Sequence, residues 1–313
     1  MRWMYFALFV GCTPPPEAPE GLDDSTNYLM EKFYSSDAEF EAGIQGFINW
    51  YDTEGAGMTN EDATLETVDA YTVGDLTEAA ISHLPIDDEI LIDAKDGTIE
   101  PRDLSKAKGV VSLAEMACAW STAEALLVRP DQHEVFNKDF EDYERTYLSS
   151  RSVFEEATEA LVFDQIEDAL SPFDDAFSRD DFARSLLMTE NNLDPSAVFG
   201  TNLEPYPMNL DLRHGLFTIN EEEVGVMAII TYSISAAWGK HESNALLQSF
   251  SIEVIIERAT EQSLRMLAVW SQPKGGGLEP DSPLALNVAV NKALASSQRI
   301  SDICEGKIDI VSE

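Results

Sequence analysis

The last third of the chain alternates apolar and polar residues with a period of two, and this pattern constrains the fold more than any other feature. The alternation occupies Met208–Leu212, Ile230–Ile234 and Phe250–Ile256, and Leu264–Trp270 follows in the same style. A period of two places successive side chains on opposite faces of a strand. One polar face is typical of an antiparallel sheet that is covered on one side. We therefore predict an antiparallel sheet in this region.

A long helix is predicted directly after these strands. Pro283 suits a first helical turn, and Gly306 ends the segment. Between them one stripe recurs at steps of three or four residues: Leu286, Val290, Ala293, Ser297, Ile300 and Cys304. A helix of about 22 residues spans about 33 Å, which is enough to cross a sheet. We expect this helix to pack on the sheet, because each large apolar side chain left in water forfeits about 1.5–3 kcal/mol.

The first half of the chain has mainly helical patterns. Ser36 with Glu39 and Ser112 with Glu115 each form a capping box, which predicts helices that begin there. The second of these helices should end before Pro130. Further elements are predicted as helices at 59–71, 155–170 and 179–188, and as strands at 90–92, before an Asp96-Gly97 turn, and at 145–154. The fold class is therefore α+β, with a mainly helical region at 28–142 and an α+β region at 143–313.

The order of elements over residues 143–306 resembles a known arrangement. Long strands followed by one long C-terminal helix are similar to the helix-grip arrangement of START-like lipid-transfer domains. The resemblance rests on element order alone, and a generic α+β sandwich has the same order.

The N-terminus has the pattern of an export signal. Arg2 precedes an uncharged apolar run, Trp3–Val10, and then Gly11 and Cys12. Residues 8–12 resemble the lipobox of bacterial lipoproteins, although Phe9 stands where that family usually has leucine. The resemblance implies that residues 1–11 are a signal peptide and that Cys12 is lipidated. It also implies a cell-envelope protein of the outer-membrane class, on the periplasmic or surface side. The alternative is a short buried segment that happens to contain a cysteine.

Residues 12–27 are predicted to be an extended tether. Thr13–Gly21 has four prolines in nine residues, so it can neither continue a helix nor pair in a central strand. A solvated tether suits a lipid-bearing cysteine, because more than one acyl chain, at about 0.8 kcal/mol per buried CH₂, anchors a protein stably.

The charge of the chain restricts its partners. It has 58 acidic and 20 basic residues and a formal net charge of −38. Such a charge repels phosphate backbones and anionic lipid surfaces, which excludes nucleic acid as a partner and makes the lipid the predicted membrane attachment. The acidic residues are spread along the whole chain, which favours a solvated surface over a cation-binding tail. An apolar content of 44% is enough for a real core.

No motif predicts a catalytic centre, a metal or a cofactor. The chain lacks a Gly-x-Ser-x-Gly nucleophile elbow, and the His-Glu pairs at His133 and His241 lack the second histidine of a zinc site. The loop from Asp52 has some features of a calcium loop but has alanine at the fifth and twelfth positions. Lys274 with three following glycines lacks the order of a phosphate loop. Catalytic residues are therefore unassigned.

Two further cysteines allow one disulfide. In an exported protein Cys118 and Cys304 could pair. Each lies in a predicted helix, however, and single buried thiols are common.

The leading hypothesis is a lipid-anchored envelope protein with a non-enzymatic binding or interaction role. The alternative is a periplasmic enzyme, for example a carboxylate-based hydrolase. The expected partners are the membrane, through the anchor, and a protein or a small apolar ligand. We expect an apolar or amphipathic ligand to lie between the sheet and the final helix. The side chains expected to face it are those of Tyr232, Phe250, Ile252 and Trp270. Small helix residues such as Ala293 and Ser297 would leave a gap for it, or would instead let the helix approach the sheet closely.

Overall fold

In the computed structural model, the described residues are 21–58, 72–129, 132, 135, 140–148, 183–191, 203, 206–239, 244–275 and 283–310. Over these ranges nine strands form one antiparallel sheet in the order β1-β4-β11-β10-β8-β7-β6-β5, with β9 paired to β10. The strands are β1 (Thr72–Val73), β4 (Lys108–Met116), β5 (Phe140–Leu148), β6 (Ala183–Asn191), β7 (Tyr206–Ile219), β8 (Glu222–Ser233), β9 (Ala237–Trp238), β10 (Ala245–Ala259) and β11 (Gln262–Lys274).

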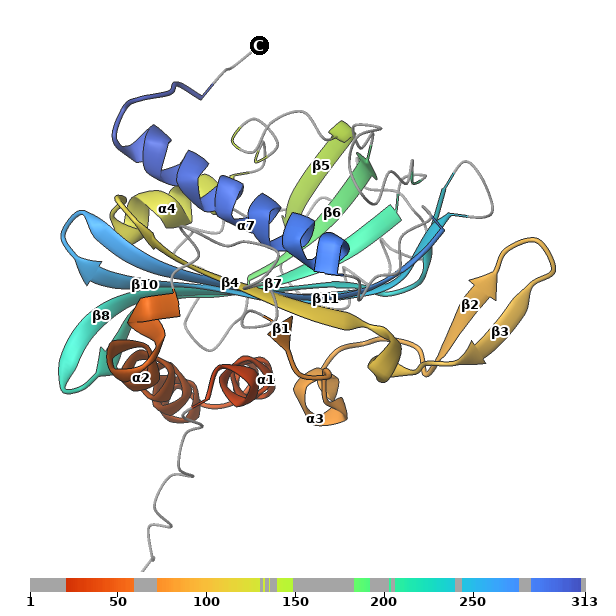
Figure 1. The fold of residues 1–313 in the computed structure, drawn as a ribbon, viewed down its shortest axis with the longest axis horizontal. Helices are drawn as coiled ribbons and strands as arrows, with labels where there is room; N and C mark the ends of the chain where they lie inside the picture. The colour runs from red at the N-terminus through yellow and green to blue at the C-terminus, as the bar shows by residue number, and fades with distance from the viewer. Residues whose placement is uncertain are drawn as a thin grey trace, which may run out of the picture.

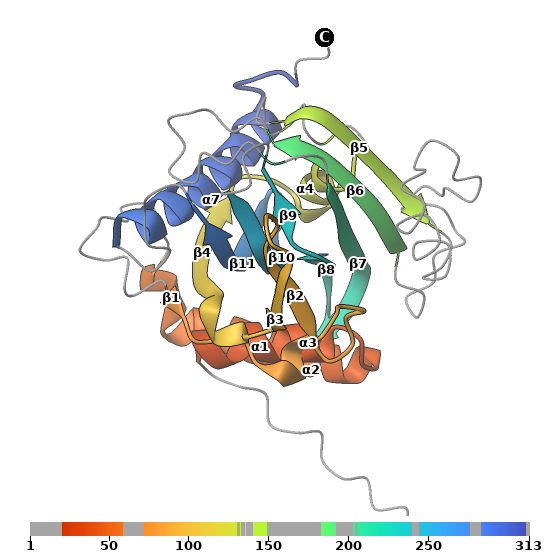
Figure 2. The ribbon, with the colours of Figure 1, turned by 90° about the vertical axis from the view of Figure 1, so that its right-hand side faces the viewer.

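Helices cover both faces of this sheet (Figure 1). They are α1 (Leu22–Lys32), α2 (Asp37–Thr53), α3 (Glu78–Ile81), α4 (Trp120–Leu127) and α7 (Pro283–Cys304). The sheet is curved, with α1, α2 and α3 on its convex side and α4 and α7 on its concave side (Figures 1 and 2). A separate hairpin of β2 (Glu89–Asp93) and β3 (Thr98–Pro101) projects from one end of the sheet (Figure 1). Two short 3₁₀ helices complete the described elements, η1 (Gly55–Met58) and η4 (Leu104–Lys106).

The predicted α+β fold is confirmed, and so are its sheet and its C-terminal helix. The four alternating stretches coincide with β7, β8, β10 and β11, except that Ile234 lies one residue past the end of β8, and α7 spans residues 283–304 as predicted. Phe250 is in register with Tyr232 on one side and with Trp270 on the other. The helix predicted from Ser36 is also confirmed, because the Ser36 side chain accepts a hydrogen bond from the Glu39 backbone N–H.

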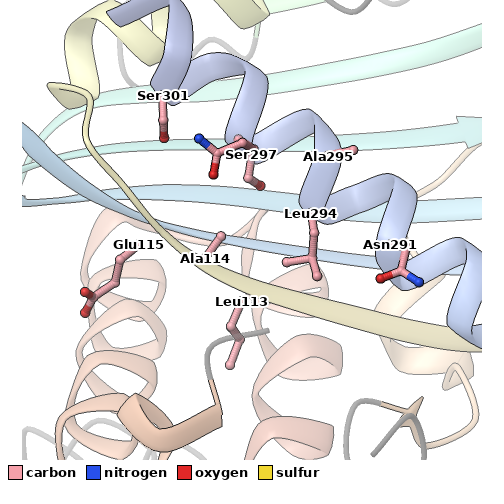
Figure 3. Close-up of a pocket in the computed structure, with 9 residues that line it drawn as sticks. Leu113, Ala114, Glu115, Asn291, Leu294, Ala295, Ser297 and Ser301 are labelled. Atoms are coloured by element: carbon pink, nitrogen blue, oxygen red, sulfur yellow. The ribbon is translucent and has the colours of Figure 1, made fainter. Parts of the chain in front are cut away.

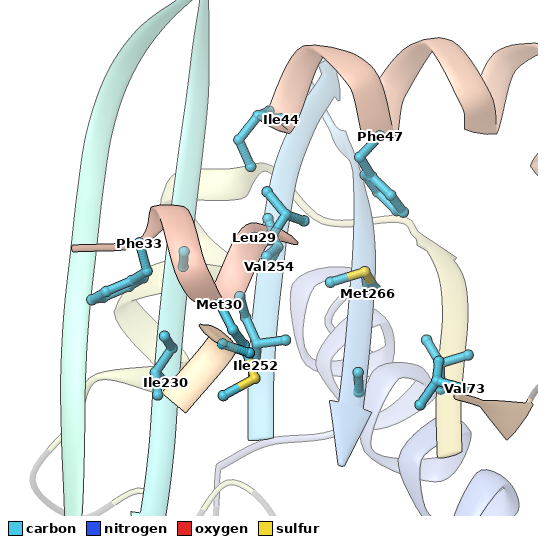
Figure 4. Packing of buried hydrophobic residues seen from close by; sticks show 14 of the residues in the cluster. Leu29, Met30, Phe33, Ile44, Phe47, Val73, Ile230, Ile252, Val254 and Met266 are labelled. Atoms are coloured by element: carbon cyan, nitrogen blue, oxygen red, sulfur yellow. The ribbon is translucent and has the colours of Figure 1, made fainter. Parts of the chain in front are cut away.

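The main core lies between the convex face and the N-terminal helices. Figure 4 shows Ile252, Val254 and Met266 of the sheet packed against Leu29 and Ile44 of α1 and α2. All five side chains are fully buried. At about 1.5–3 kcal/mol for each buried large apolar side chain, this layer supplies much of the stability.

The polar side of β7 is also buried, which corrects the prediction of a sheet covered on one side only. Asn209 and Asp211 are fully buried on the convex face, where Asp211 accepts a hydrogen bond from the Tyr34 hydroxyl. Arg213 donates to the Phe33 carbonyl at 2.8 Å and pairs with Asp37. These bonds to the α1–α2 connection offset the cost of burying polar groups.

The helix predicted from Ser112 is wrong. Residues 108–116 form β4, where Ser112 is in register with Leu267, and the helix begins only at Trp120. The β-branched Val110 and Val111 suit a strand, and pairing with β11 outweighs the local capping pattern. Because β4 belongs to the same sheet as β7–β11, residue 142 does not separate a helical part from a sheet part.

The helix predicted at 179–188 is wrong from residue 183 onward, because β6 pairs there with β7. Sheet pairing supplies backbone hydrogen bonds that a local helical pattern cannot anticipate. The strand predicted at 90–92 is confirmed as β2, and Gly97 has the positive φ of 74° that its turn requires. The strand predicted at 145–154 corresponds to β5 in its described part.

Several predictions lie outside the described residues. They are the signal peptide with Cys12, the tether up to residue 20, and the helices at 59–71 and 155–170. The predicted tether is wrong from Leu22 onward, because α1 begins there and Ser25 and Thr26 are buried. Among the described helices, none has the length and apolar character needed to cross a membrane.

Candidate ligand-binding site

The concave face of the central strands has a row of partly exposed side chains. Thr231, Ser251, Glu253, Leu267 and Val269, on β8, β10 and β11, are only half-buried. Their neighbours on the convex face are fully buried. We call these five residues the concave patch. Because Ser251 is in register with Thr231 and Val269, and Glu253 with Leu267, the patch is continuous across three strands.

α7 borders the concave patch on one side. Val290 of α7 is fully buried and packs with Val110, while Val269 and Leu294 lie against the same small cluster. At the other end of the sheet, β5, β6 and β7 curve over the concave side (Figure 2). The patch therefore lies in the middle of the sheet, between a helix and a curled sheet end.

An ion pair lies where the concave patch meets α7. Arg265 Nε donates to Glu253 Oε1 at 2.6 Å, and Arg265 Nη1 donates to the Ser297 hydroxyl at 2.7 Å and to that of Ser296. The Arg265 side chain is 4% exposed and that of Glu253 is 13% exposed. Within the described ranges, Glu253 Oε2 has no protein partner. The pair thus leaves one carboxylate oxygen for another group.

This pair was missed by sequence reasoning. The sequence feature that pointed to the pair is a glutamate and an arginine on two apolar strands that are joined by a short turn. Sequence alone does not reveal that both side chains occur on the same face, because that depends on the register of the hairpin.

A disulfide fixes the far end of α7. It joins Cys118, after β4, to Cys304, the last residue of α7. Nearby, Ile300 and Ile255 are buried in the same cluster as Cys118. The C-terminal half of α7 is therefore held firmly on the sheet, whereas the concave patch lies nearer its N-terminal half.

The four side chains predicted to face a ligand lie on the other face of the sheet. Tyr232, Phe250, Ile252 and Trp270 are fully buried in the core with α1 and α2, and Trp270 Nε1 donates to the Gly74 carbonyl at 3.0 Å. The prediction that they face α7 is wrong. The physical reason is that both faces of the sheet are covered, and the largest apolar side chains are buried under the N-terminal layer. Ser297 does face the sheet, where it contacts Arg265 and is 3% exposed.

A small pocket lies on the outer side of α7, at the edge of the sheet. Its volume is about 280 Å³, and it lies between β4 and α7. Figure 3 shows Leu294 and Ser297 pointing toward β4, whereas Leu113 and Glu115 point away from α7. Ligand cavities are about 300–1,000 Å³ and mostly apolar, and this pocket is smaller and is also lined by Asn291 and Gln298. The concave patch is therefore the better candidate.

Two described carboxyl groups, those of Asp93 and Asp103, do not suit the role of a general acid. A hydrogen bond from the Lys95 backbone N–H lowers the pKa of Asp93, and one from the Ser105 hydroxyl lowers the pKa of Asp103. A general acid needs a raised pKa. Within the described ranges, no three His, Cys, Asp or Glu side chains gather as a metal site requires.

The sequence matches no family model and no curated protein. The fold resembles several solved structures. A START superfamily protein from Mycobacterium smegmatis is 10% identical, with a TM-score of 0.34, over 64% of this chain and 99% of that one. A fragment of a STAR-related lipid transfer protein from Xanthomonas axonopodis is 6% identical, with a TM-score of 0.37, over 66% and 92%. The lipid transfer and protein localization domain of human StarD13 is 11% identical, with a TM-score of 0.36, over 64% and 78%. These scores are low, so the function proposed below is argued from the residues of this chain.

Proposed function

We propose that the protein binds a small amphipathic ligand on the concave patch. The observation that carries this proposal is the half-buried row of side chains in the middle of the sheet, beside α7. Where central strands pack fully against helices, as on the convex face, the side chains at the equivalent positions are fully buried. A ligand would cover the remaining apolar surface and gain about 25 cal/mol per Å².

The side chains of the patch define the chemistry of the ligand. Leu267 and Val269 offer apolar contact, whereas Thr231 and Ser251 offer hydroxyl groups. Glu253 Oε2 is available to accept a hydrogen bond from the ligand, and Arg265 balances the charge of that carboxylate. A ligand with an apolar body and one neutral donor, such as a hydroxyl, fits this arrangement best.

A titration with a long-chain fatty alcohol that carries a fluorophore at the far end of its chain tests the proposal. Ser251→Trp fills the patch, and Thr218→Trp adds the same side chain at an exposed position of β7. We expect the first variant to lose binding by about tenfold or more, because about 1.4 kcal/mol of lost contact suffices, and the second to bind as the wild type does. Equal binding by all three proteins, each with an unchanged circular dichroism spectrum, would contradict the proposal.

We further propose attachment to the cell envelope through a lipid on Cys12, with the proline-rich segment that precedes α1 as the tether. Support comes from the lipobox-like pattern and from the Cys118–Cys304 disulfide, since disulfides persist mainly in oxidising compartments. Labelling in cells with a clickable fatty acid should mark the wild type but not Cys12→Ser. A soluble protein that begins at Met1 would overturn this part of the proposal.

A further inference from the structure

A second and larger pocket lies between the β2–β3 hairpin and the segment around β9. Its volume is about 750 Å³. Acidic side chains form part of its wall (Asp87, Asp88 and Glu89), and apolar side chains form much of the rest, chiefly Leu91, Ile99 and Trp238. We call this pocket the hairpin groove. The β2–β3 hairpin, which forms one side of the groove, projects from one end of the sheet (Figure 1).

The acidic wall has a net negative charge. Asp87, Asp88 and Glu89 are all exposed. Arg102 lies at this wall, where its Nε donates to the Asp87 carbonyl at 2.8 Å, and Lys274 pairs with Asp93 nearby. These two cations against the carboxylates of Asp87, Asp88, Glu89 and Asp93 leave an excess of negative charge that a cationic group can neutralise.

The apolar wall is unusually accessible. Ile99 is 59% exposed, and it is one of two large apolar side chains counted as exposed in the described part of the chain. It is in register with Leu91. An exposed apolar side chain beside a pocket marks a place where a partner can bury area.

Hydrogen bonds join the β2–β3 hairpin, which forms one side of the groove, to the sheet. Lys274 donates from Nζ to the Ile92 carbonyl at 2.6 Å and lies 5.1 Å from the centre of the Trp238 ring. Arg102 also reaches the Ile234 carbonyl at 3.4 Å. These bonds hold the hairpin against β8 and β11, so the groove is largely formed before a partner arrives.

We propose that the hairpin groove docks a basic segment of a partner protein in which lysine or arginine alternates with apolar residues. The cationic side chains pair with Asp87, Asp88 and Glu89, and an apolar side chain covers Ile99 and Leu91. A second copy of this chain does not fit, because each copy has a formal net charge of −38. A bare polyamine does not fit either, because it leaves the apolar wall exposed.

Fluorescence anisotropy with a short labelled peptide of alternating lysine and valine tests this proposal. The variant Asp87→Lys/Asp88→Lys/Glu89→Lys removes the acidic wall. Its matched control, Glu221→Lys/Glu222→Lys/Glu223→Lys, makes the same charge change at exposed positions in the turn after β7 and at the start of β8. Three surface ion pairs are together worth enough to change affinity by about fivefold or more. We therefore expect the first variant to weaken binding by at least that factor and the control to change it little.

A second pair of variants tests how much the apolar wall contributes to peptide binding. Ile99→Ser should weaken binding about threefold or more, whereas Leu216→Ser alters the other exposed apolar side chain, 42% exposed on β7, and should not. A lysine-glycine peptide of equal length should bind more weakly than the lysine-valine peptide.

Equal losses of affinity in the two triple lysine variants would mean unspecific charge attraction and would overturn the proposal. Equal binding of the two peptides would mean a site for bare cations and would also overturn it, as would the absence of binding. All variants should retain the wild-type melting curve.

Discussion

Arg265 of β11 and Glu253 of β10 form a nearly buried ion pair on the concave face, with 2.6 Å between Nε and Oε1. The serines of α7 hold the same guanidinium, with Ser297 Oγ at 2.7 Å from Nη1. A charged group therefore links the helix to two central strands at the border of the concave patch. The arrangement positions Glu253 beside Leu267, where a ligand with one polar end would meet both kinds of surface.

Removing one partner of this pair should be costly. Arg265→Ala leaves the Glu253 carboxylate largely buried without its cation, and we expect the free energy of unfolding to fall by about 3 kcal/mol. The double variant Arg265→Met/Glu253→Leu should recover much of that loss, since an apolar pair of similar volume needs no counter-ion. Urea unfolding followed by circular dichroism measures both. A double variant as unstable as the single one would contradict this account of the pair.

Gly225 should tolerate no side chain. A Cβ atom there would lie 2.0 Å from the Trp120 ring of α4, so Gly225→Ala forces the indole to move. We expect a loss of about 1–3 kcal/mol, as in other overpacked sites. Gly74→Ala is the control, because a Cβ atom at Gly74 would meet nothing within 4 Å. Thermal unfolding of the two variants should differ clearly, and equal melting temperatures would show that α4 packs otherwise.

The disulfide should stabilise the whole fold. It closes a loop between residues 186 positions apart, and the loss of such a crosslink can cost up to about 5 kcal/mol through the entropy of the unfolded chain. We expect Cys118→Ala/Cys304→Ala to lower the melting temperature. A reducing agent should lower that of the wild type and leave the variant unchanged. A reductant effect of equal size in the variant would rule out this bond as the cause.

Part of the loss of folding stability at alkaline pH should come from the ionisation of Tyr51. Burial, with a hydrogen bond from its hydroxyl to Glu115 at 3.1 Å, raises the pKa of Tyr51 well above its ordinary value of 10.0. Above that ordinary value the unfolded chain releases the proton and the folded chain keeps it, so stability falls as the pH rises. Below it this contribution is fully present. Between pH 9 and about pH 11, Tyr51→Phe should show a shallower fall in urea-unfolding stability than the wild type, and parallel curves would contradict this assignment.

The strands were predictable because alternation is a local property. In Phe250–Ile256 the alternation of apolar residues is enough to predict a strand. In residues 283–304 the apolar stripe at steps of three and four residues predicts a helix of the observed length. The strand β4 was not predictable in this way, because Ser112 and Glu115 imitate a helix start and the pairing of β4 with β11 depends on residues far along the chain.

The candidate site could be predicted only in part. A ligand between the sheet and α7 was expected, but alternation cannot tell which helical layer covers which face. Trp270 was therefore assigned to the wrong side. The concave patch itself has ordinary residues such as Ser251 and Val269, and only their partial exposure in the folded chain distinguishes them.

Photo-crosslinking with a fatty alcohol that bears a diazirine is the most direct test of ligand binding at the concave patch. After irradiation, peptide mapping should place the adduct on the β10 and β11 peptides that contain Ser251 and Val269, and an excess of unlabelled alcohol should abolish it. Adducts on the outer pocket at Asn291 and Gln298, or labelling that competition does not reduce, would contradict the proposed function.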